Sequence, residues 1–150
     1  MTRSGIQDIR KGMLASFAGT IVLSIIMVTK QMAGIAPQMN PIADLADIAH
    51  RLIGLPAAAL IGWVLHFGVG IVVWGTLFAA LHQRIPGSNL IKGILFGIGA
   101  WVLMMVVFQP IAGQGLFGLN GGMVVPMMTL MLHFVYGVVL GLVFAKLSAR

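Results

Sequence analysis

The sequence contains no cysteine and only three acidic residues among its 150 positions. The absence of cysteine excludes disulfides, thiol nucleophiles and thiolate-bound zinc or iron–sulfur centres. The three acids are Asp8, Asp44 and Asp47, and each lies outside the predicted spans. A carboxylate pair for acid–base catalysis and an acidic proton relay within the membrane are therefore both missing. We expect a protein that is not an enzyme.

Charged residues are scarce as well, at 8% of the chain against roughly 25% in a soluble domain, and hydrophobic residues make up 59%. A transmembrane helix needs about 20 apolar residues in a row, and the sequence contains four such runs. We predict an all-α fold, an integral membrane four-helix bundle in which residues 1–150 form a single transmembrane domain. The predicted spans cover about 13–31, 55–81, 90–109 and 123–147.

A short amphipathic helix is predicted over residues 41–53, in the connection after the first span. Asn40 is a favoured N-cap residue, and Pro41 suits the first helical position. The apolar residues that follow fall mainly on one face, as in a helix that lies in the membrane interface. Gly54 and Pro56 end this helix before the second span begins.

The sequence repeats itself in its two halves. Leu65-His66-Phe67 in the second apolar run matches Leu132-His133-Phe134 in the fourth, and a glycine follows each histidine four residues later. Lys11-Gly12 and Lys92-Gly93 open the first and third runs in the same way. Each half enters and leaves the membrane on the same side, so the bundle is predicted to consist of two parallel two-helix repeats.

The repeat places His66 and His133 at similar depths near the middle of the membrane. An ionisable residue inside a membrane is by default a candidate for a functional site. If the second and fourth spans face each other, the two imidazoles point towards a shared pocket. They could then be the axial ligands of a b-type haem, with Gly70 and Gly137 leaving room for the flat ring. The same pair could bind a quinone or a metal ion.

Helix packing alone is the alternative explanation of the motif, and it makes the absence of any cofactor the default. Gly70 and Gly137 would then simply permit close contact between helices. Each histidine would be neutral and hydrogen-bonded to a nearby hydroxyl, from Ser24, Thr129 or Tyr136.

Three hydroxyl residues, Ser16, Thr20 and Ser24, recur at every fourth position of the first span and share one helix face. They could line the polar track of a small channel. The alternative is that they bond to their own backbone or pack against a neighbouring helix, as small polar residues do in membranes. The second interpretation is the default.

The positions of the cations predict the orientation of the chain. Only two of them, Lys30 and Arg51, belong to the first and third connections taken together, both to the first, and Lys30 is expected to snorkel at the end of its span. The other seven lie in the N-terminus, the middle connection and the C-terminus: Arg3, Arg10, Lys11, Arg84, Lys92, Lys146 and Arg150. Cytoplasmic segments are rich in Lys and Arg, so both termini are predicted to be cytoplasmic. The net charge of +6 is explained in this way, without a nucleic-acid partner.

Six segments carry a family resemblance: Lys11-Gly12, Met39-Asn40-Pro41-Ile42-Ala43, Leu65-His66-Phe67 to Trp74-Gly75, Lys92-Gly93-Ile94-Leu95-Phe96-Gly97, Ala112-Gly113-Gln114-Gly115-Leu116-Phe117-Gly118 and Leu132-His133-Phe134. This pattern resembles a family of small bacterial inner-membrane proteins of unknown function, the YagU-like proteins. The resemblance implies four helices and a location in the bacterial inner, or cytoplasmic, membrane. It implies no activity and no site residues.

Taken together, these features predict a small multi-pass membrane protein that acts as an accessory or interaction subunit of a larger membrane complex, such as a respiratory one. The expected partners are the lipid bilayer and other membrane subunits, or further copies of the chain. A b-type haem protein that carries electrons and a small channel or permeability factor are the two alternative functions.

Overall fold

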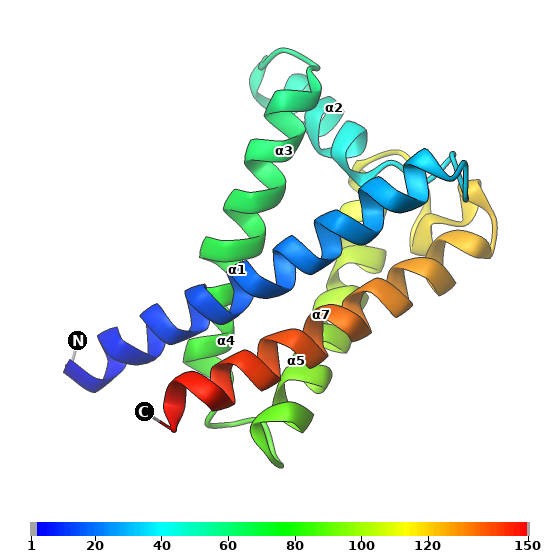
Figure 1. The fold of residues 1–150 in the computed structure, drawn as a ribbon. Helices are drawn as coiled ribbons and strands as arrows, with labels where there is room; N and C mark the ends of the chain where they lie inside the picture. The colour runs from blue at the N-terminus through cyan, green and yellow to red at the C-terminus, as the bar shows by residue number, and fades with distance from the viewer. Residues whose placement is uncertain (1–2, 150) are drawn as a thin grey trace.

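The computed structural model describes residues 3–149, and over these residues the chain is helical and contains no strand (Figure 1). The first and fourth spans are single helices, α1 (Arg3–Met32) and α7 (Val124–Ser148). The second span consists of α3 (Ala59–Phe67), a π-helical turn η1 (Gly68–Val73) and α4 (Trp74–Leu81). The third consists of α5 (Asn89–Leu103), a π-helical turn η2 (Met104–Phe108) and α6 (Gln109–Ile111). Two shorter helices lie in the connections, α2 (Pro41–Ile53) and the 3-10 helix η3 (Leu116–Gly121).

Four helical segments are long and apolar enough to cross a membrane, which confirms the predicted four-helix membrane fold and indicates a multi-pass membrane protein. Three of them agree with the predicted spans to within a few residues. The first does not, because α1 begins at Arg3 rather than near residue 13. Asp8, Arg10 and Lys11 continue this helix beyond its apolar part, since charged residues end a span in lipid but do not end a helix.

The first span lies at the centre of the arrangement. α1 packs against α4 on one side and against α7 on the other, and α5 packs against α7. Figure 1 shows α3 and α7 diverging towards the end of the molecule that carries α2, while the two termini lie together at the opposite end. The second and fourth spans therefore approach each other at one end of the bundle and separate at the other.

Glycine contacts support the two-fold repeat. A Cβ on Gly12 of α1 would strike the Gly75 carbonyl of α4. In the second half, a Cβ on Gly93 of α5 would lie only 2.7 Å from the Gly141 Cα of α7. The glycine that opens each half thus packs against the corresponding glycine in the second helix of that half, so the two hairpins close by the same small-residue contact.

The interfacial helix α2 has the predicted bounds and caps. The Asn40 side chain accepts a hydrogen bond from the Ala43 N–H at 3.2 Å, and Gly54 ends the helix in the left-handed conformation, with φ of 71°. Ile42, on the buried face of α2, packs so closely on α3 that a Cβ on Gly62 would strike the Ile42 carbonyl. α2 is therefore held on the end of the second span.

The Lys30 side chain, near the end of α1, is covered by the connection that follows this helix. Its ammonium donates to the carbonyls of Ile35, Ala36 and Met39 at 3.1, 2.9 and 2.9 Å. The side chain is only 6% exposed. Three backbone carbonyls of the turn after α1 take the place of water around the ammonium, and this fixes the connection that leads to α2.

Replacing Lys30 with methionine should destabilise the fold by about 2 kcal/mol, because three buried carbonyls lose a charged donor. Thermal unfolding of the detergent-solubilised protein measures the effect. The matched control is Lys146→Met, since Lys146 is exposed on α7 and its replacement should change stability by less than about 0.5 kcal/mol. Equal melting temperatures for the two variants would contradict the structural role of Lys30.

Candidate binding cavity

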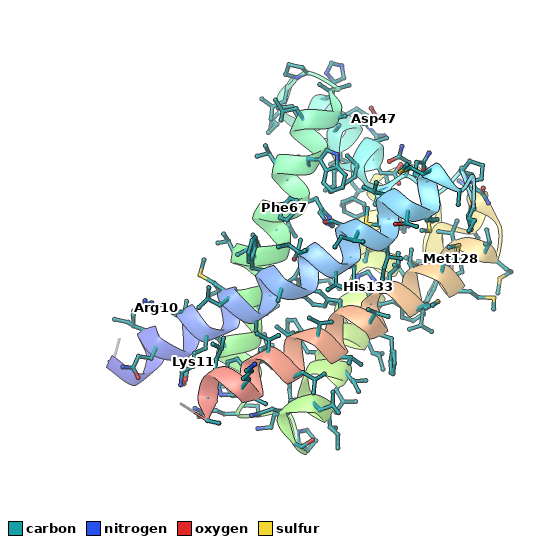
Figure 2. All side chains as sticks on the ribbon, viewed as in Figure 1. Arg10, Lys11, Asp47, Phe67, Met128 and His133 are labelled. Carbon is teal, nitrogen blue, oxygen red and sulfur yellow. The ribbon has the colours of Figure 1, made fainter. Side chains whose placement is uncertain are left out.

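A cavity of about 300 Å³ lies between the four spans and α2, and both histidines of the repeat line it. Figure 2 shows His133 near the middle of the molecule, on α7 beside α1. The polar side chains of the lining come from the first, second and fourth spans: Thr20, His66, Trp74, Thr129, His133 and Tyr136. Most of the remaining lining is aliphatic or thioether, contributed largely by the third span. The structure therefore brings His66 and His133 to one cavity.

His133 is held in one tautomer. Its Nδ1 lies 2.8 Å from the Thr129 backbone carbonyl, four residues earlier in α7. A carbonyl can only accept, so Nδ1 carries the proton and donates it. A neutral imidazole has one N–H, and no carboxylate lines the cavity to pair with a charged ring. Nε2 of His133 is therefore an acceptor, and within the described residues it has no hydrogen-bond partner.

His66 is held in the opposite tautomer. Its Nε2 lies 3.2 Å from the Ser24 hydroxyl, and that hydroxyl donates its only proton to the Thr20 carbonyl at 2.8 Å. Ser24 must then accept from His66, so Nε2 carries the proton and Nδ1 is left as an acceptor. Ser24 is one of the hydroxyls expected to bond to a histidine. Thr129 bonds to the other histidine, through its backbone carbonyl rather than its hydroxyl.

The π-helical turns η1 and η2 both contribute to the wall of the cavity, although they lie in different halves of the repeat. Val69 and Gly70 of η1 line it, and so do Met104, Val107 and Phe108 of η2. A π turn inserts an extra residue into a helix and is frequent at functional sites. The position of such a turn depends on tertiary packing, and the apolar periodicity of the two runs does not reveal it.

Ser16 of α1 fastens the first π turn. The backbone N–H of Trp74 is directed at the carbonyls of Val69 and Ile71. The Gly70 carbonyl between them accepts the proton of the Ser16 hydroxyl. Because Ser16 has no second proton, it accepts from the Tyr136 hydroxyl of α7, which also contacts it. One serine thus links three spans beside the cavity.

The two glycines of the repeat have different surroundings. Gly70 lines the cavity, and a Cβ on it would lie 2.5 Å from the Thr20 Oγ1. Gly137 packs away from the cavity, where a Cβ would lie 2.5 Å from the Gly93 carbonyl oxygen of α5. Both glycines therefore allow close helix contact, and Gly70 alone of the two also borders the space that a ligand would occupy.

The Thr20 hydroxyl is buried without a partner. The residue is 1% exposed, and Oγ1 makes no hydrogen bond in the structure. Burying a hydroxyl without a partner costs roughly 1–3 kcal/mol. Its neighbours in the hydroxyl series, Ser16 and Ser24, are both bonded, so the series packs between helices and leaves one buried hydroxyl without a partner.

Aromatic side chains close the bundle at the end near the termini. Phe78 of α4 packs edge-on against Phe96 of α5 and Phe144 of α7, with ring centroids 5.2 and 5.1 Å apart. His82 covers the Phe144 ring at 4.8 Å. The cavity therefore lies on the other side of this cluster, where the second and fourth spans diverge.

α2 covers the cavity at the opposite end. Pro41 and Leu45 of this helix are part of the lining. Two hydrogen bonds tie α2 to the connection after the third span: Gln114 Nε2 donates to the Asp44 Oδ1 at 3.2 Å, and Arg51 donates to the last carbonyl of α6 at 3.1 Å. α2 thus closes this end of the cavity and is held there by residues that follow the third span.

The Asp44 carboxyl of α2, the helix that covers the cavity, is partly buried and has a shifted pKa. Burial raises the pKa of the Asp44 carboxyl above its ordinary value, and the neighbouring Asp47 adds to the rise. The hydrogen bond from Gln114 and the charge of Arg51 act in the opposite direction. The folded state therefore favours protonated Asp44. The contribution of Asp44 to stability is fully present below the pKa of about 4 that its carboxyl has in the unfolded chain. This contribution is lost as the pH rises through the higher pKa of the folded state.

The Asp44→Asn variant should lose this pH dependence. The amide keeps an acceptor oxygen for Gln114 but carries no charge to desolvate, so we expect a higher melting temperature at neutral pH. Melting temperatures between about pH 4 and pH 8 test this, with Asp47→Asn on the exposed side of α2 as the control. An unchanged decline with pH in Asp44→Asn would show that another group is responsible.

Residues 6–150 match a family of unknown function, DUF6789. The chain belongs to this family. No curated protein and no solved structure matches the chain. The assignment to DUF6789 agrees with the predicted membership of a family without a known activity, and it leaves the chemistry of the cavity to be argued from the residues.

The cavity of this DUF6789 protein offers a metal ion few ligands beyond the two imidazoles. In the described part of the chain, no three His, Cys, Asp or Glu side chains gather closely enough to hold a metal ion. A divalent cation would also enter an apolar space without a neutralising carboxylate, which is costly. The lining of the cavity therefore suits an uncharged ligand better than a metal ion.

The sequence predicted the histidines of the DUF6789 cavity, but it predicted few of the other residues of the wall. Tyr136 was predicted as a hydroxyl partner of a histidine, and it lines the cavity but bonds to Ser16 instead. Trp74 also lines the cavity, and its place before the glycine that ends the first copy of the repeat was a signal for it. The third span carries no such signal, because every side chain that it contributes to the wall is apolar, and half of them lie in η2.

Proposed function

We propose that this DUF6789 protein is a non-enzymatic membrane protein that binds a small, uncharged, largely apolar ligand between its spans. The observation that carries the proposal is the presence of two imidazoles, each with an unpartnered ring nitrogen, in one apolar cavity of about 300 Å³. Ligand pockets are typically 300–1,000 Å³ in volume and mostly apolar, with a few polar groups that orient the ligand. A buried polar group without a partner is otherwise a cost to the fold.

The ligand reaches the cavity from the lipid phase in this proposal. The second and third spans both line the cavity, yet α3 and α5 do not pack extensively on each other. Val72 and Val106, on these two spans, are exposed.

A protein of this size with no acid–base pair suits an accessory role, in which it binds the ligand and contacts a larger membrane complex.

Mass spectrometry of small molecules extracted from the purified protein tests this function. Protein isolated from native membranes in mild detergent should carry one apolar molecule in near-stoichiometric amount. The His66→Leu/His133→Leu double variant should retain at least about tenfold less, because two buried hydrogen bonds are lost. His50→Leu, on the exposed face of α2, is the matched control. If wild type and double variant carry the same molecules in the same amounts, the proposal is wrong.

A b-type haem is the second candidate ligand, because both imidazoles line one cavity. His133 presents Nε2, which suits axial ligation. His66 presents Nδ1, which lies next to the point where the ring is attached to the side chain, so ligation requires the Ser24 bond to break and the ring to turn over. An absorption spectrum tests this alternative: a Soret band lost in both His66→Ala and His133→Ala supports haem, and a colourless protein from haem-replete cells rejects it.

We also propose that the protein lies in the bacterial inner membrane with both termini in the cytoplasm. The resemblance to YagU-like proteins and the distribution of cations support this. Figure 2 shows Arg10 and Lys11 at the end of the molecule opposite Asp47. Because the chain has no cysteine, a single cysteine can report each side: Asp47→Cys should react with an impermeant maleimide in intact cells, and Ser148→Cys should not. Labelling of Ser148→Cys but not of Asp47→Cys would show that the termini lie outside the cytoplasm and that the proposed orientation is wrong.

A further inference from the structure

The polar groups around the cavity offer hydrogen-bond acceptors in excess of donors. His133 Nε2 and His66 Nδ1 are both acceptors, because the other nitrogen of each ring is a donor already bonded to Thr129 or Ser24. No proton on either imidazole remains for a ligand.

The Tyr136 hydroxyl follows the same pattern. Ser16 gives its proton to the Gly70 carbonyl, so the bond between Ser16 and Tyr136 requires that Tyr136 donates. The phenolic oxygen keeps acceptor capacity and has no proton to offer. Tyr136 lines the cavity together with the two histidines.

The two threonines complete the inventory. The Thr129 hydroxyl donates to carbonyls of its own helix, to Val125 at 2.7 Å, and accepts from the Trp101 indole at 3.1 Å. The Thr20 hydroxyl has no partner, but its oxygen is fully buried and a ligand cannot reach it. The Trp74 indole N–H, which has no hydrogen-bond partner within the described residues, is the free donor of the lining. Three acceptors without protons therefore face one accessible donor.

From this inventory we infer that the ligand donates hydrogen bonds, and that it is an aromatic diol of the quinol class rather than the corresponding quinone. The inference rests on the proposed ligand-binding function and names the substrate class of the same cavity. A quinol hydroxyl can donate to an imidazole nitrogen, whereas a quinone oxygen placed there would meet a second lone pair. A site built to bond a hydroxyl strongly rejects an analogue that lacks it, because its buried polar groups are left unpaired.

The shape and polarity of the lining suit a flat ring. Trp74, Phe108 and Tyr136 contribute aromatic faces from three different spans. Aromatic rings pack favourably in offset or edge-on contact at centroid distances of roughly 4.5–7 Å. The aliphatic and thioether side chains of the third span complete an apolar surface for the ring and leave its hydroxyls to the imidazoles.

Binding of three matched naphthalenes to the purified full-length protein in nanodiscs tests the inference. The probes are 1,4-dihydroxynaphthalene kept under argon, 1,4-naphthoquinone, and 1,4-dimethoxynaphthalene. The first two have nearly the same shape and differ by two hydrogens. Quenching of tryptophan fluorescence, with Trp74 in the lining, reports binding. We expect the diol to bind at least about tenfold more tightly than the quinone and the dimethoxy compound, for two hydrogen bonds gained.

Two variants assign the preference to the residues. His133→Phe keeps a flat ring but removes the acceptor, so the diol should lose most of its advantage while the quinone is little affected. Thr20→Val removes an unsatisfied buried hydroxyl that a ligand cannot reach, so the fold should be at least as stable and the preference for the diol should be retained. Thr20→Val therefore gives a result even if His133→Phe does not fold.

The possible results separate the two proposals. If none of the three probes binds, the ligand-binding function itself is wrong. If the quinone or the dimethoxy compound binds as tightly as the diol, the cavity binds apolar ligands and the inference about the diol is overturned. A diol preference that disappears in Thr20→Val would equally overturn it, since the preference would then come from a protein donor.

Discussion

Replacing Gly93 with valine is expected to force α5 away from α7 and to destabilise the protein by about 3 kcal/mol. A Cβ at this position would lie 2.6 Å from the Gly141 N and 2.7 Å from its Cα, and it would strike the Gly137 carbonyl. All three atoms belong to the backbone of α7, so no rotation of a side chain can relieve the overlap. The two helices must separate along the contact that closes the second hairpin of the repeat.

Gly99→Val is the matched control for Gly93→Val. Gly99 lies in the same helix, six residues later, and a Cβ there would have no heavy atom within 4 Å. Both variants carry the same change in helix propensity, so their difference isolates the helix contact. Unfolding by titration with SDS measures both free energies. Similar values would show that the α5–α7 contact can widen at little cost.

The repeat shows what sequence reasoning could predict of this fold. Lys-Gly openings and Leu-His-Phe motifs are local patterns, and they indicated four spans and the pairing of hairpins. The interfacial helix was also predictable, because Asn40, Pro41 and Gly54 are local signals for its two ends. These features could be predicted because each depends on a residue and its near neighbours in the sequence, and those neighbours are the same before and after folding.

The cavity was only partly predictable, and for a physical reason. The two histidines could be selected because a polar side chain in an apolar run is costly anywhere in the sequence. Their tautomers, the π turns and the free Thr20 hydroxyl arise from contacts between spans. Lys30 is a further case, because the three carbonyls that surround its ammonium come from the turn at Ile35–Met39, and no local pattern in the sequence predicts that contact.

Gly70→Ala is expected to weaken ligand binding at least about tenfold and to destabilise the fold by about 2 kcal/mol. The new methyl group would lie 2.5 Å from the Thr20 Oγ1 and 3.0 Å from its Cγ2. Thr20 is β-branched and buried, so it has little freedom to turn away. α1 and η1 must then move apart, which stretches the Ser16 bond to the Gly70 carbonyl and alters the cavity wall between them.

Gly68→Ala is the control, and it should have the opposite sign. Gly68 lies in the same π turn, and a Cβ on it would meet nothing within 4 Å. Alanine is favoured over glycine in a helix by up to about 1 kcal/mol, so this variant should be slightly more stable and bind the ligand unchanged.

A second substitution in Gly70→Ala separates the steric cause from a general effect on the π turn. Thr20→Ala removes both atoms that the new methyl group would strike, so the Gly70→Ala/Thr20→Ala double variant should recover most of the lost stability. The coupling energy between the two positions should then be about 1–3 kcal/mol, as for residues in direct contact. Additive effects of the two substitutions would mean that the close approach of α1 and η1 does not determine the shape of the cavity.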